Sequence, residues 1–227
     1  MCFSTTASFA SGVILTVIGV ASIKKVQNSK QILFACIPFI FAIQQFSEGF
    51  VWLSLLNSTN LFWQQLSTYS FLLFALIIWP AWVPISMFLI EKRHKRKIIL
   101  GIFSVLGLLF SILSAIYLII YKSEAQITSY HIHYELNIPF GAKMMIGLLY
   151  LVPTVISNFI SSMKGVAIMG IFVLISYFVS RYLYNDYVIS VWCFFSALIS
   201  VTIYFILARD NKTKYFSHNS STSLNYK

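Results

Sequence analysis

Long apolar stretches, separated by short polar or basic segments, dominate the pattern along the chain. An apolar stretch of about 18 residues is the length that an α-helix needs to cross a hydrocarbon core about 30 Å thick. The pattern predicts an all-α integral membrane protein, a bundle of about seven transmembrane helices. The predicted spans are residues 8–22, 32–56, 68–89, 98–121, 141–161, 165–182 and 187–208.

Two segments fall outside this pattern. The connection at residues 122–140, "KSEAQITSYHIHYELNIPF", is too long and too patterned for a bare connector. The residues after Asp210 are polar and rich in Ser and Asn, which is typical of disorder. We therefore predict one transmembrane domain, residues 1–209, with a long outer loop at 122–140 and a disordered tail at 210–227. Within the third span, Pro80 and Pro84 predict a kinked helix.

Composition agrees with a membrane protein and excludes an ordinary soluble domain. Hydrophobic residues make up 59% of the 227 residues and charged residues only 10%, where about 25% charged residues is typical of soluble domains. The run "EKRHKRK" at residues 91–97 is interpreted as a basic loop that touches anionic lipid, and we expect no nucleic-acid partner. The predicted partner of the surface is the lipid bilayer.

Basic residues are distributed unevenly between the two sides of the predicted bundle. Loops rich in Lys and Arg stay in the cytoplasm, so the distribution predicts an outside N-terminus and a cytoplasmic C-terminus. Only Lys122, Lys143 and Arg181 fall on the outer side. The other thirteen are Lys24, Lys25, Lys30, Lys92, Arg93, Lys95, Arg96, Lys97, Lys164, Arg209, Lys212, Lys214 and Lys227.

The second span carries polar residues in "FAIQQFSEGFVWL". Gln44, Gln45, Glu48 and Trp52 recur at helical spacing and share one face. Glu48 follows Ile32 by sixteen residues, a climb of about 24 Å that places it in the outer half of the membrane. An ionised side chain facing lipid costs about 2.5–3.5 kcal/mol, so this face should point into the bundle.

Two interpretations of this polar face stay open. It is a clamp that only ties helices together, or it is a proton or cation site with Glu48 as a catalytic acid. The second predicts an outward-facing polar pocket for a small molecule or lipid, formed by Gln44, Gln45, Glu48, Trp52 and, from the last span, Trp192. Taken alone, Trp192 fits a packing position, as do Tyr150 and Asn158 in the fifth span.

The outer loop contains a second candidate site, "HIHYE". His131, His133 and Glu135 alternate, and alternate residues of an extended segment point to one side. Two imidazoles and a carboxylate are acceptable ligands for zinc or a similar divalent metal. The alternative interpretation is a pair of solvated loop histidines.

Known seven-span classes are excluded by their own signatures. A microbial retinal protein needs a Schiff-base lysine in the last span, and residues 187–208 contain none. The Asp-Arg-Tyr and Asn-Pro-x-x-Tyr signatures of G-protein-coupled receptors are absent from the sequence. The alkaline-ceramidase-like hydrolases hold zinc with histidines inside their helices, and no predicted span here contains a histidine.

Three segments carry a resemblance: "MCFSTTASF" at the start, "IPFIFAIQQFSEGFVWL" in the second span and "SVWCFFSALIS" in the last. Together they resemble an uncharacterised family of bacterial multi-spanning membrane proteins whose chains begin Met-Cys-Phe-Ser. The resemblance implies a location in the bacterial cytoplasmic membrane. It implies no biochemical activity.

Three functional hypotheses follow. In the first, the protein binds or transports a small molecule, ion or proton in the pocket around Glu48. In the second, it is a membrane-embedded, metal-assisted enzyme acting on a lipid at the outer leaflet. In the third, it is a structural or accessory subunit. The first leads, because the sequence shows no set of nucleophile, base and oxyanion donor.

Overall fold

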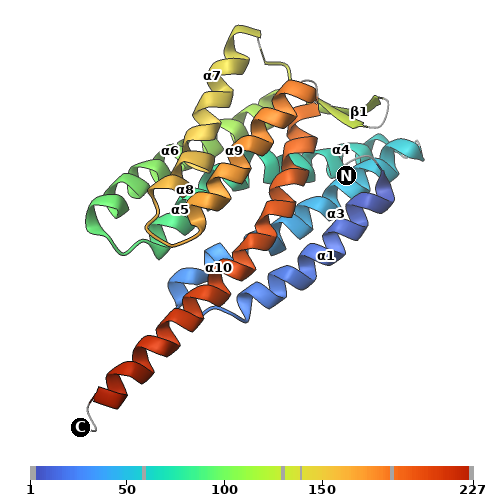
Figure 1. Ribbon diagram of the computed structural model, residues 1–227. Coiled ribbons are helices and arrows are strands. Elements are labelled where there is room, and N and C mark those ends of the chain that lie inside the picture. Colours follow the sequence, from blue (N-terminus) through green and yellow to red (C-terminus); the bar gives the residue numbers. More distant parts are fainter. Residues whose placement is uncertain (1–3, 58–59, 129–130, 139, 185–186, 225–227) are drawn as a thin grey trace.

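The computed structural model describes residues 4–57, 60–128, 131–138, 140–184 and 187–224. Of these, residues 140–144, 196 and 211–224 are described by their backbone alone. Helices make up most of the fold, and a small hairpin lies at one end (Figure 1). The elements are α1 (Thr5–Ile23), the short turn η1 (Ser29–Gln31), α2 (Ile32–Ala35), α3 (Ile37–Leu56), α4 (Leu61–Leu72), the π-helix η2 (Leu73–Ile78), α5 (Trp79–Ile90), α6 (His94–Ile120), β1 (Glu124–Thr128), β2 (His131–Glu135), α7 (Phe140–Leu151), the π-helix η3 (Val152–Ile156), α8 (Ser157–Ile160), α9 (Val166–Leu183) and α10 (Val188–Leu224).

The prediction of an all-α membrane protein is confirmed. Among the described residues, six helical segments are long and apolar enough to cross a bilayer: Thr5–Ile23, Ser29–Leu56, Leu61–Ile90, His94–Ile120, Val166–Leu183 and Val188–Asp210. The fifth predicted span, 141–161, coincides with α7, η3 and α8, whose apolar part at Met145–Ile160 is shorter. The backbone of α10 extends past Asp210 to Leu224, and disorder of the tail stays a prediction.

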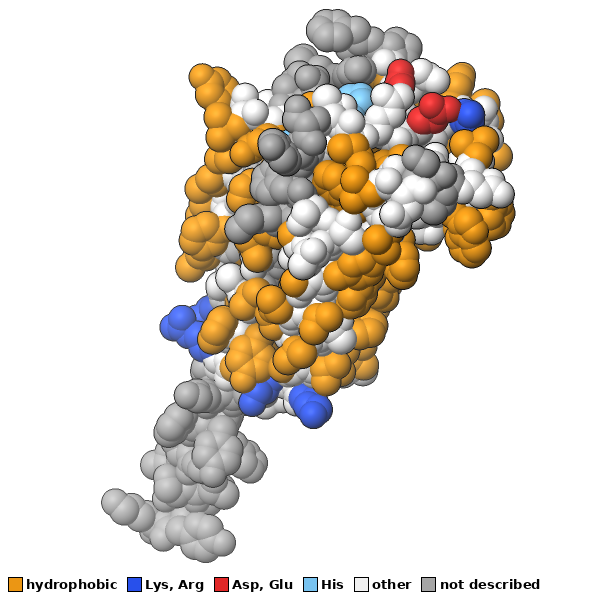
Figure 2. Space-filling view, turned by 90° about the vertical axis from the view of Figure 1, so that its right-hand side faces the viewer, with side chains coloured by type: hydrophobic (Ala, Val, Ile, Leu, Met, Phe, Trp, Pro, Cys, Tyr) orange, Lys and Arg blue, Asp and Glu red, His pale blue; other side chains and the backbone are white. Residues whose placement is uncertain are grey.

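Large apolar side chains cover the outside of the bundle between its two ends. Ile119 is 84% exposed, and Val17 and Leu113 are each 65% exposed, a degree of apolar exposure that soluble monomers rarely show. In Figure 2 this hydrophobic surface lies between basic side chains at one end and acidic side chains with a histidine at the other. We call these the basic end and the hairpin end.

Helices α1 and α3 pack closely through small residues. Ser8, Gly12, Gly19 and Ser22 form the buried face of α1 together with Leu15. A Cβ atom on Gly19 would lie 2.9 Å from the Cα atom of Phe39 in α3, so the two backbones approach too closely for a side chain at this position. Such small-residue contacts bring membrane helices together where lipid supplies no hydrophobic driving force.

The predicted kink near Pro80 takes the form of the π-helix η2, directly before α5. The Trp79 N–H bonds to the Phe74 carbonyl five residues back. In the same pattern the Ala75 carbonyl would pair with Pro80, which has no N–H. The Tyr150 hydroxyl donates to that carbonyl instead, at 2.8 Å. A neighbouring helix thus supplies the missing donor, which a backbone inside a membrane requires.

The loop at residues 122–140 forms a hairpin. Strands β1 and β2 pair antiparallel, with Ala125 opposite Tyr134. The extended conformation predicted for residues 131–135 is confirmed. The Tyr134 ring is buried and stacks on Phe71 with ring centroids 4.6 Å apart, so the hairpin packs on the end of the bundle.

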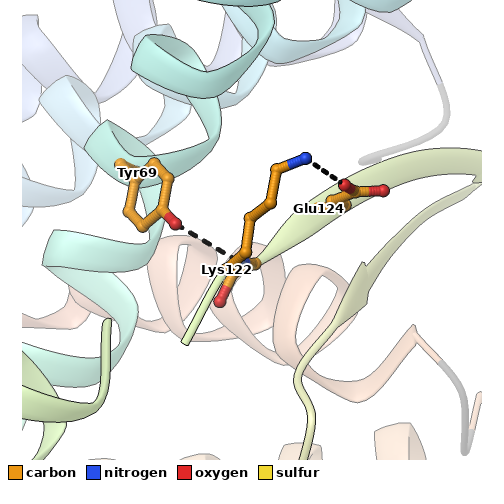
Figure 3. A network of polar contacts seen from close by, with 4 residues as sticks. Tyr69, Lys122 and Glu124 are labelled. Carbon is orange, nitrogen blue, oxygen red and sulfur yellow. Dashed lines mark hydrogen bonds and ion pairs between the residues drawn. The ribbon is translucent and has the colours of Figure 1, made fainter. Parts of the chain in front are cut away.

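A polar network fixes the start of this hairpin (Figure 3). The Ser123 N–H donates to the Tyr69 hydroxyl oxygen at 3.2 Å, which ties the hairpin to α4. Lys122 and Glu124 form an ion pair at 2.8 Å, and its hydrogen bond to Glu124 raises the pKa of Lys122. Both side chains are more than one third exposed, so the pair contributes little to stability.

At the basic end, hydrogen bonds to Glu91 join two segments of the chain. One carboxylate oxygen accepts from the N–H groups of Lys92 at 2.9 Å and Arg93 at 2.8 Å, and from the Ser162 hydroxyl at 2.6 Å. The other accepts from the Ser162 N–H at 2.6 Å. Burial works to raise the pKa of Glu91, but the hydrogen bonds from Ser162, Arg93 and Lys92 outweigh it and lower that pKa. Glu91 therefore fastens the end of α5 to the connection before α9.

Candidate functional site

Gln44 connects three helices in the interior of the bundle. Its side chain is fully buried. Oε1 accepts from Trp79 Nε1 of α5 at 2.7 Å, and Nε2 donates to Cys193 Sγ of α10 at 3.1 Å. Phe41, almost one turn earlier on α3, stacks on the Trp79 ring with centroids 3.9 Å apart. These contacts fix the rotamer of Trp79 and the spacing of α3, α5 and α10.

Glu48 lies one turn beyond Gln44 on the same face of α3 and has 0% exposure. Its Oε1 accepts from Ser190 Oγ of α10 at 2.5 Å. Its Oε2 accepts from Gln45 Nε2 at 3.5 Å. The carboxyl group thus faces the interior of the bundle and joins α3 to the first turn of α10.

A cavity of about 60 Å³ lies beside this network. Its wall comes from α3, α5, the α7–α8 segment, α9 and α10, and it is mostly apolar. Four aromatic rings line it, those of Phe41, Trp79, Tyr150 and Trp192. The Tyr150 and Trp192 rings meet edge to face with centroids 5.5 Å apart. The polar side chains of the wall are Thr154, Asn158, Cys193 and Ser200.

Asn158 is the most unusual of these polar side chains. It is only 2% exposed. Its Nδ2 donates to the carbonyls of Thr154 at 2.9 Å and Val155 at 3.2 Å. Its Oδ1 accepts no hydrogen bond from any residue that the structure describes. A buried acceptor without a donor costs about 1–3 kcal/mol, so this atom requires an explanation.

A family model described as "Family of unknown function (DUF6629)" matches residues 1–218. The chain belongs to the DUF6629 family. The match extends from the start of the chain into α10 and so includes every helix of the cavity wall. A family without an assigned activity is what the resemblance of the three segments predicts. No curated protein and no solved structure matches the chain.

The cavity of this DUF6629 protein shares one residue with the predicted pocket. Of the five predicted pocket residues, Trp192 lines the cavity, whereas Gln44, Gln45, Glu48 and Trp52 do not. Gln44 is hydrogen-bonded to Trp79 and Cys193, two residues that line the cavity. Glu48 is hydrogen-bonded to Ser190. Trp52 belongs to a buried cluster beneath the hairpin. The polar face of α3 is buried in the bundle, and its Gln44 and Glu48 form hydrogen bonds to α5 and α10.

The sequence also contains a signal for the wall of this cavity. Tyr150, Thr154 and Asn158 recur every four residues around Pro153, which places them on one helix face. This is the same kind of polar stripe as the one on α3. Interpreting Tyr150 and Asn158 only as packing positions missed it.

The structure does not gather the predicted metal ligands. His131, His133 and Glu135 share the face of β2 opposite the buried Ile132 and Tyr134. Among the described residues, no three His, Cys, Asp or Glu side chains lie close enough together to hold a metal ion. The physical reason is strand geometry: His131 and Glu135 are four residues apart, about 13 Å along an extended chain.

The histidines of the hairpin instead contact aromatic rings. The His131 ring stacks on Tyr187 with centroids 4.7 Å apart, and His133 meets the same ring edge-on at 6.2 Å. Burial lowers the pKa of His131, which favours the neutral imidazole. These contacts join the hairpin to the start of α10.

A second hollow, about 380 Å³, lies between the end of α3 and the start of α4. Ser54 and Ser67 line it, and their hydroxyl oxygens lie 3.1 Å apart. Phe50 and Trp63 at its edge are 56% and 58% exposed. This hollow therefore opens onto the lipid-facing surface.

Proposed function

We propose that this DUF6629 protein binds a small molecule inside the membrane, in the cavity lined by Phe41, Trp79, Tyr150 and Trp192. The observation that carries the proposal is that Asn158, a lining residue of this cavity, has a buried Oδ1 without a donor among the described residues. Buried polar atoms are almost always hydrogen-bonded, and small-molecule sites combine an apolar wall with a few polar groups that orient the ligand. A ligand that donates to Asn158 would satisfy this atom.

The polar face of α3 holds residues of the cavity wall in place without lining the cavity itself. Gln44 fixes Trp79 and Cys193, two members of the wall. Glu48 holds α10, the helix that also carries Trp192, Cys193 and Ser200. In this proposal both residues position the cavity wall, and Glu48 is a positioning residue without contact to the ligand. Transport of the bound molecule is an extension of the same proposal.

The enzyme hypothesis gains less support. It required Glu48 to act with His131, His133 and Glu135. The histidines lie on a hairpin packed over the cluster of Trp52 and Phe71, and Glu48 bonds to residues of α3 and α10. Binding is the function that the geometry supports best.

Blocking the cavity tests the proposal. Ser200→Phe places a ring in the cavity, because Ser200 lines it and is 2% exposed. We expect native mass spectrometry of the purified protein to show a non-covalent adduct of one small molecule per chain, and we expect this adduct to be lost in Ser200→Phe.

Thr202→Phe is the matched control. Thr202 lies on the same helix outside the wall, and its hydroxyl donates to the carbonyl three residues back, as the Ser200 hydroxyl does. The control should keep the adduct. Loss of the adduct in both variants, its retention in both, or its absence from the unmodified protein would contradict binding in this cavity.

We also propose that the hairpin end faces outward and the basic end faces the cytoplasm of a bacterial cell, with seven spans in total. The α7–α8 segment is the span that would raise the number from six to seven. It begins after the hairpin, and the Ile160 carbonyl at its other end accepts from Arg96 at the basic end at 3.2 Å. The segment therefore runs from one end of the bundle to the other, although its apolar part is short.

Reporter fusions test this orientation. A reporter fused after Lys227 should be active in the cytoplasm, and one inserted near Ser123 should be active outside, because basic loops remain cytoplasmic. The opposite pattern would refute the proposed orientation. Two reporters on the same side would refute an odd number of spans between Ser123 and Lys227, and with it the α7–α8 span.

A further inference from the structure

Among the described residues of the cavity wall, the strong hydrogen-bond donors are all paired within the protein, whereas one acceptor is not. Six lining side chains carry an N–H or O–H donor in addition to the weak donor Cys193, and each of the six donates within the protein. The bonds are Trp79 Nε1 to Gln44 Oε1 (2.7 Å), Tyr150 OH to Ala75 O (2.8 Å), Trp192 Nε1 to Val173 O (3.4 Å), Thr154 Oγ1 to Tyr150 O (2.7 Å), Ser200 Oγ to Ala197 O (2.5 Å), and Asn158 Nδ2 to Thr154 O (2.9 Å) and Val155 O (3.2 Å).

The acceptor side of the wall is different. Asn158 Oδ1 receives no hydrogen bond from the residues that the structure describes. The hydroxyl oxygens of Thr154 and Ser200 each keep acceptor capacity while they donate. Among the described lining side chains, Asn158 Oδ1 is thus an acceptor without a donor, and each strong donor is already used. A ligand that carries only acceptors would lose its water and gain nothing in return.

The lack of charge in the cavity wall and the volume of the cavity restrict the class of ligand further. The described lining residues include no Lys, Arg, His, Asp or Glu, so an ionic ligand would leave water without a counter-charge. The cavity of about 60 Å³ is several times the roughly 10–15 Å³ that a single water molecule requires. This is room for one polar group with a few carbon atoms, surrounded by aromatic rings.

We propose that the ligand is a neutral, lipophilic molecule with a hydroxyl or N–H group, and that this group donates to Asn158 Oδ1. The cavity binds ethers, ketones and other molecules that carry only acceptors more weakly. The inference rests on the proposed function, because it specifies the ligand of the same cavity. Asn158 is then the residue that determines specificity.

A pair of photoreactive probes tests the inference. A short alkanol with a diazirine in its chain, small enough for the cavity, donates a hydrogen bond, and its methyl ether has a similar shape but cannot. After irradiation of the full-length protein in detergent, labelled residues are located by mass spectrometry. We expect the alkanol to label wall residues such as Met169 about three- to ten-fold more than the ether does, the ratio that one neutral hydrogen bond typically gives.

Asn158→Ala should reduce alkanol labelling to the level of the ether. Ser157→Ala is the matched control. Its hydroxyl donates to the Pro153 carbonyl of the same helix, and Ser157 does not line the cavity. This control should keep the preference for the alkanol. If Asn158→Ala does not fold, the comparison of the two probes on the unmodified protein still tests the preference for a hydrogen-bond donor.

The possible results separate the two proposals. Equal labelling of the wall by alkanol and ether would overturn the ligand class and leave binding in the cavity standing. Labelling of the wall by neither probe, with labelling confined to the lipid-facing surface, would overturn the proposed function as well. Stronger labelling by a diazirine alkylammonium than by the alkanol would overturn the neutrality of the ligand.

Discussion

Gly107→Ala should lower the midpoint of thermal unfolding in detergent by about 3–10 °C. A Cβ atom at Gly107 of α6 would lie 1.9 Å from the carbonyl oxygen of Pro80 in α5. That oxygen belongs to the backbone of a kinked helix and cannot rotate away as a flexible side chain can. Overpacking of this kind costs about 1–3 kcal/mol, and each kcal/mol shifts the midpoint by about 2–4 °C in a protein of this size.

The same change should also weaken a polar contact. Ser111, one turn after Gly107, donates to the Ile77 carbonyl of η2 at 2.6 Å. Separating α6 from α5 lengthens this bond. Destabilisation should therefore come with faster amide exchange in the π-helix, which hydrogen-exchange mass spectrometry can measure.

Gly101→Ala is the matched control for Gly107→Ala. Gly101 lies in the same helix, and its Cβ would meet the Phe88 ring at 3.5 Å, an ordinary contact. Glycine in a helix costs about 0.5–1 kcal/mol relative to alanine, so Gly101→Ala should be neutral or slightly stabilising. If the two variants unfold at the same temperature, the close approach of α5 and α6 at Pro80 is not present in the protein.

Hydrophobic pattern was enough to locate the helices, because crossing a bilayer imposes both a length and an apolar composition. The stretch predicted at 165–182 corresponds to α9 at Val166–Leu183, and the one at 98–121 to α6 at His94–Ile120. Helix ends differ by a few residues, since polar residues such as His94 continue a helix into the interface. The fifth predicted stretch, 141–161, is the least clear because the apolar part of its helix, Met145–Ile160, is short.

Long-range partners were beyond the reach of the sequence. Helical spacing shows that Gln44 and Glu48 share a face, but it does not show what that face meets. Gln44 bonds to Trp79, 35 positions away, and to Cys193, 149 positions away. Without these partners, a polar stripe that joins helices cannot be told from one that lines a pocket. The hairpin illustrates the same limit: alternation predicts the common face of His131 and His133, but not the Tyr187 ring against which they lie.

Glu48→Leu should destabilise the protein by about 2–4 kcal/mol, whereas Glu48→Gln should unfold within a few degrees of the unmodified protein. Leucine removes the acceptor of the Ser190 hydroxyl and of Gln45 Nε2 at a site with no exposure. Each buried donor left without an acceptor costs about 1–3 kcal/mol. Glutamine keeps an acceptor oxygen for Ser190 and nearly the same volume. Thermal unfolding monitored by tryptophan fluorescence measures both variants, with Glu135→Leu as the control at an exposed glutamate.

Glu48→Gln also distinguishes the two interpretations of the polar face of α3. Because Glu48 does not line the cavity, we expect Glu48→Gln to keep the alkanol labelling of the wall together with its fold. Glutamine cannot exchange a proton as a carboxylic acid does, so a role in proton transfer would give a different result. The variant would fold but no longer bind the alkanol, or alkanol labelling would change with pH in the unmodified protein and not in the variant. That result would make Glu48 an acid that acts on the site. Intact labelling at every pH would make it the clamp that holds α10 against α3 through Ser190.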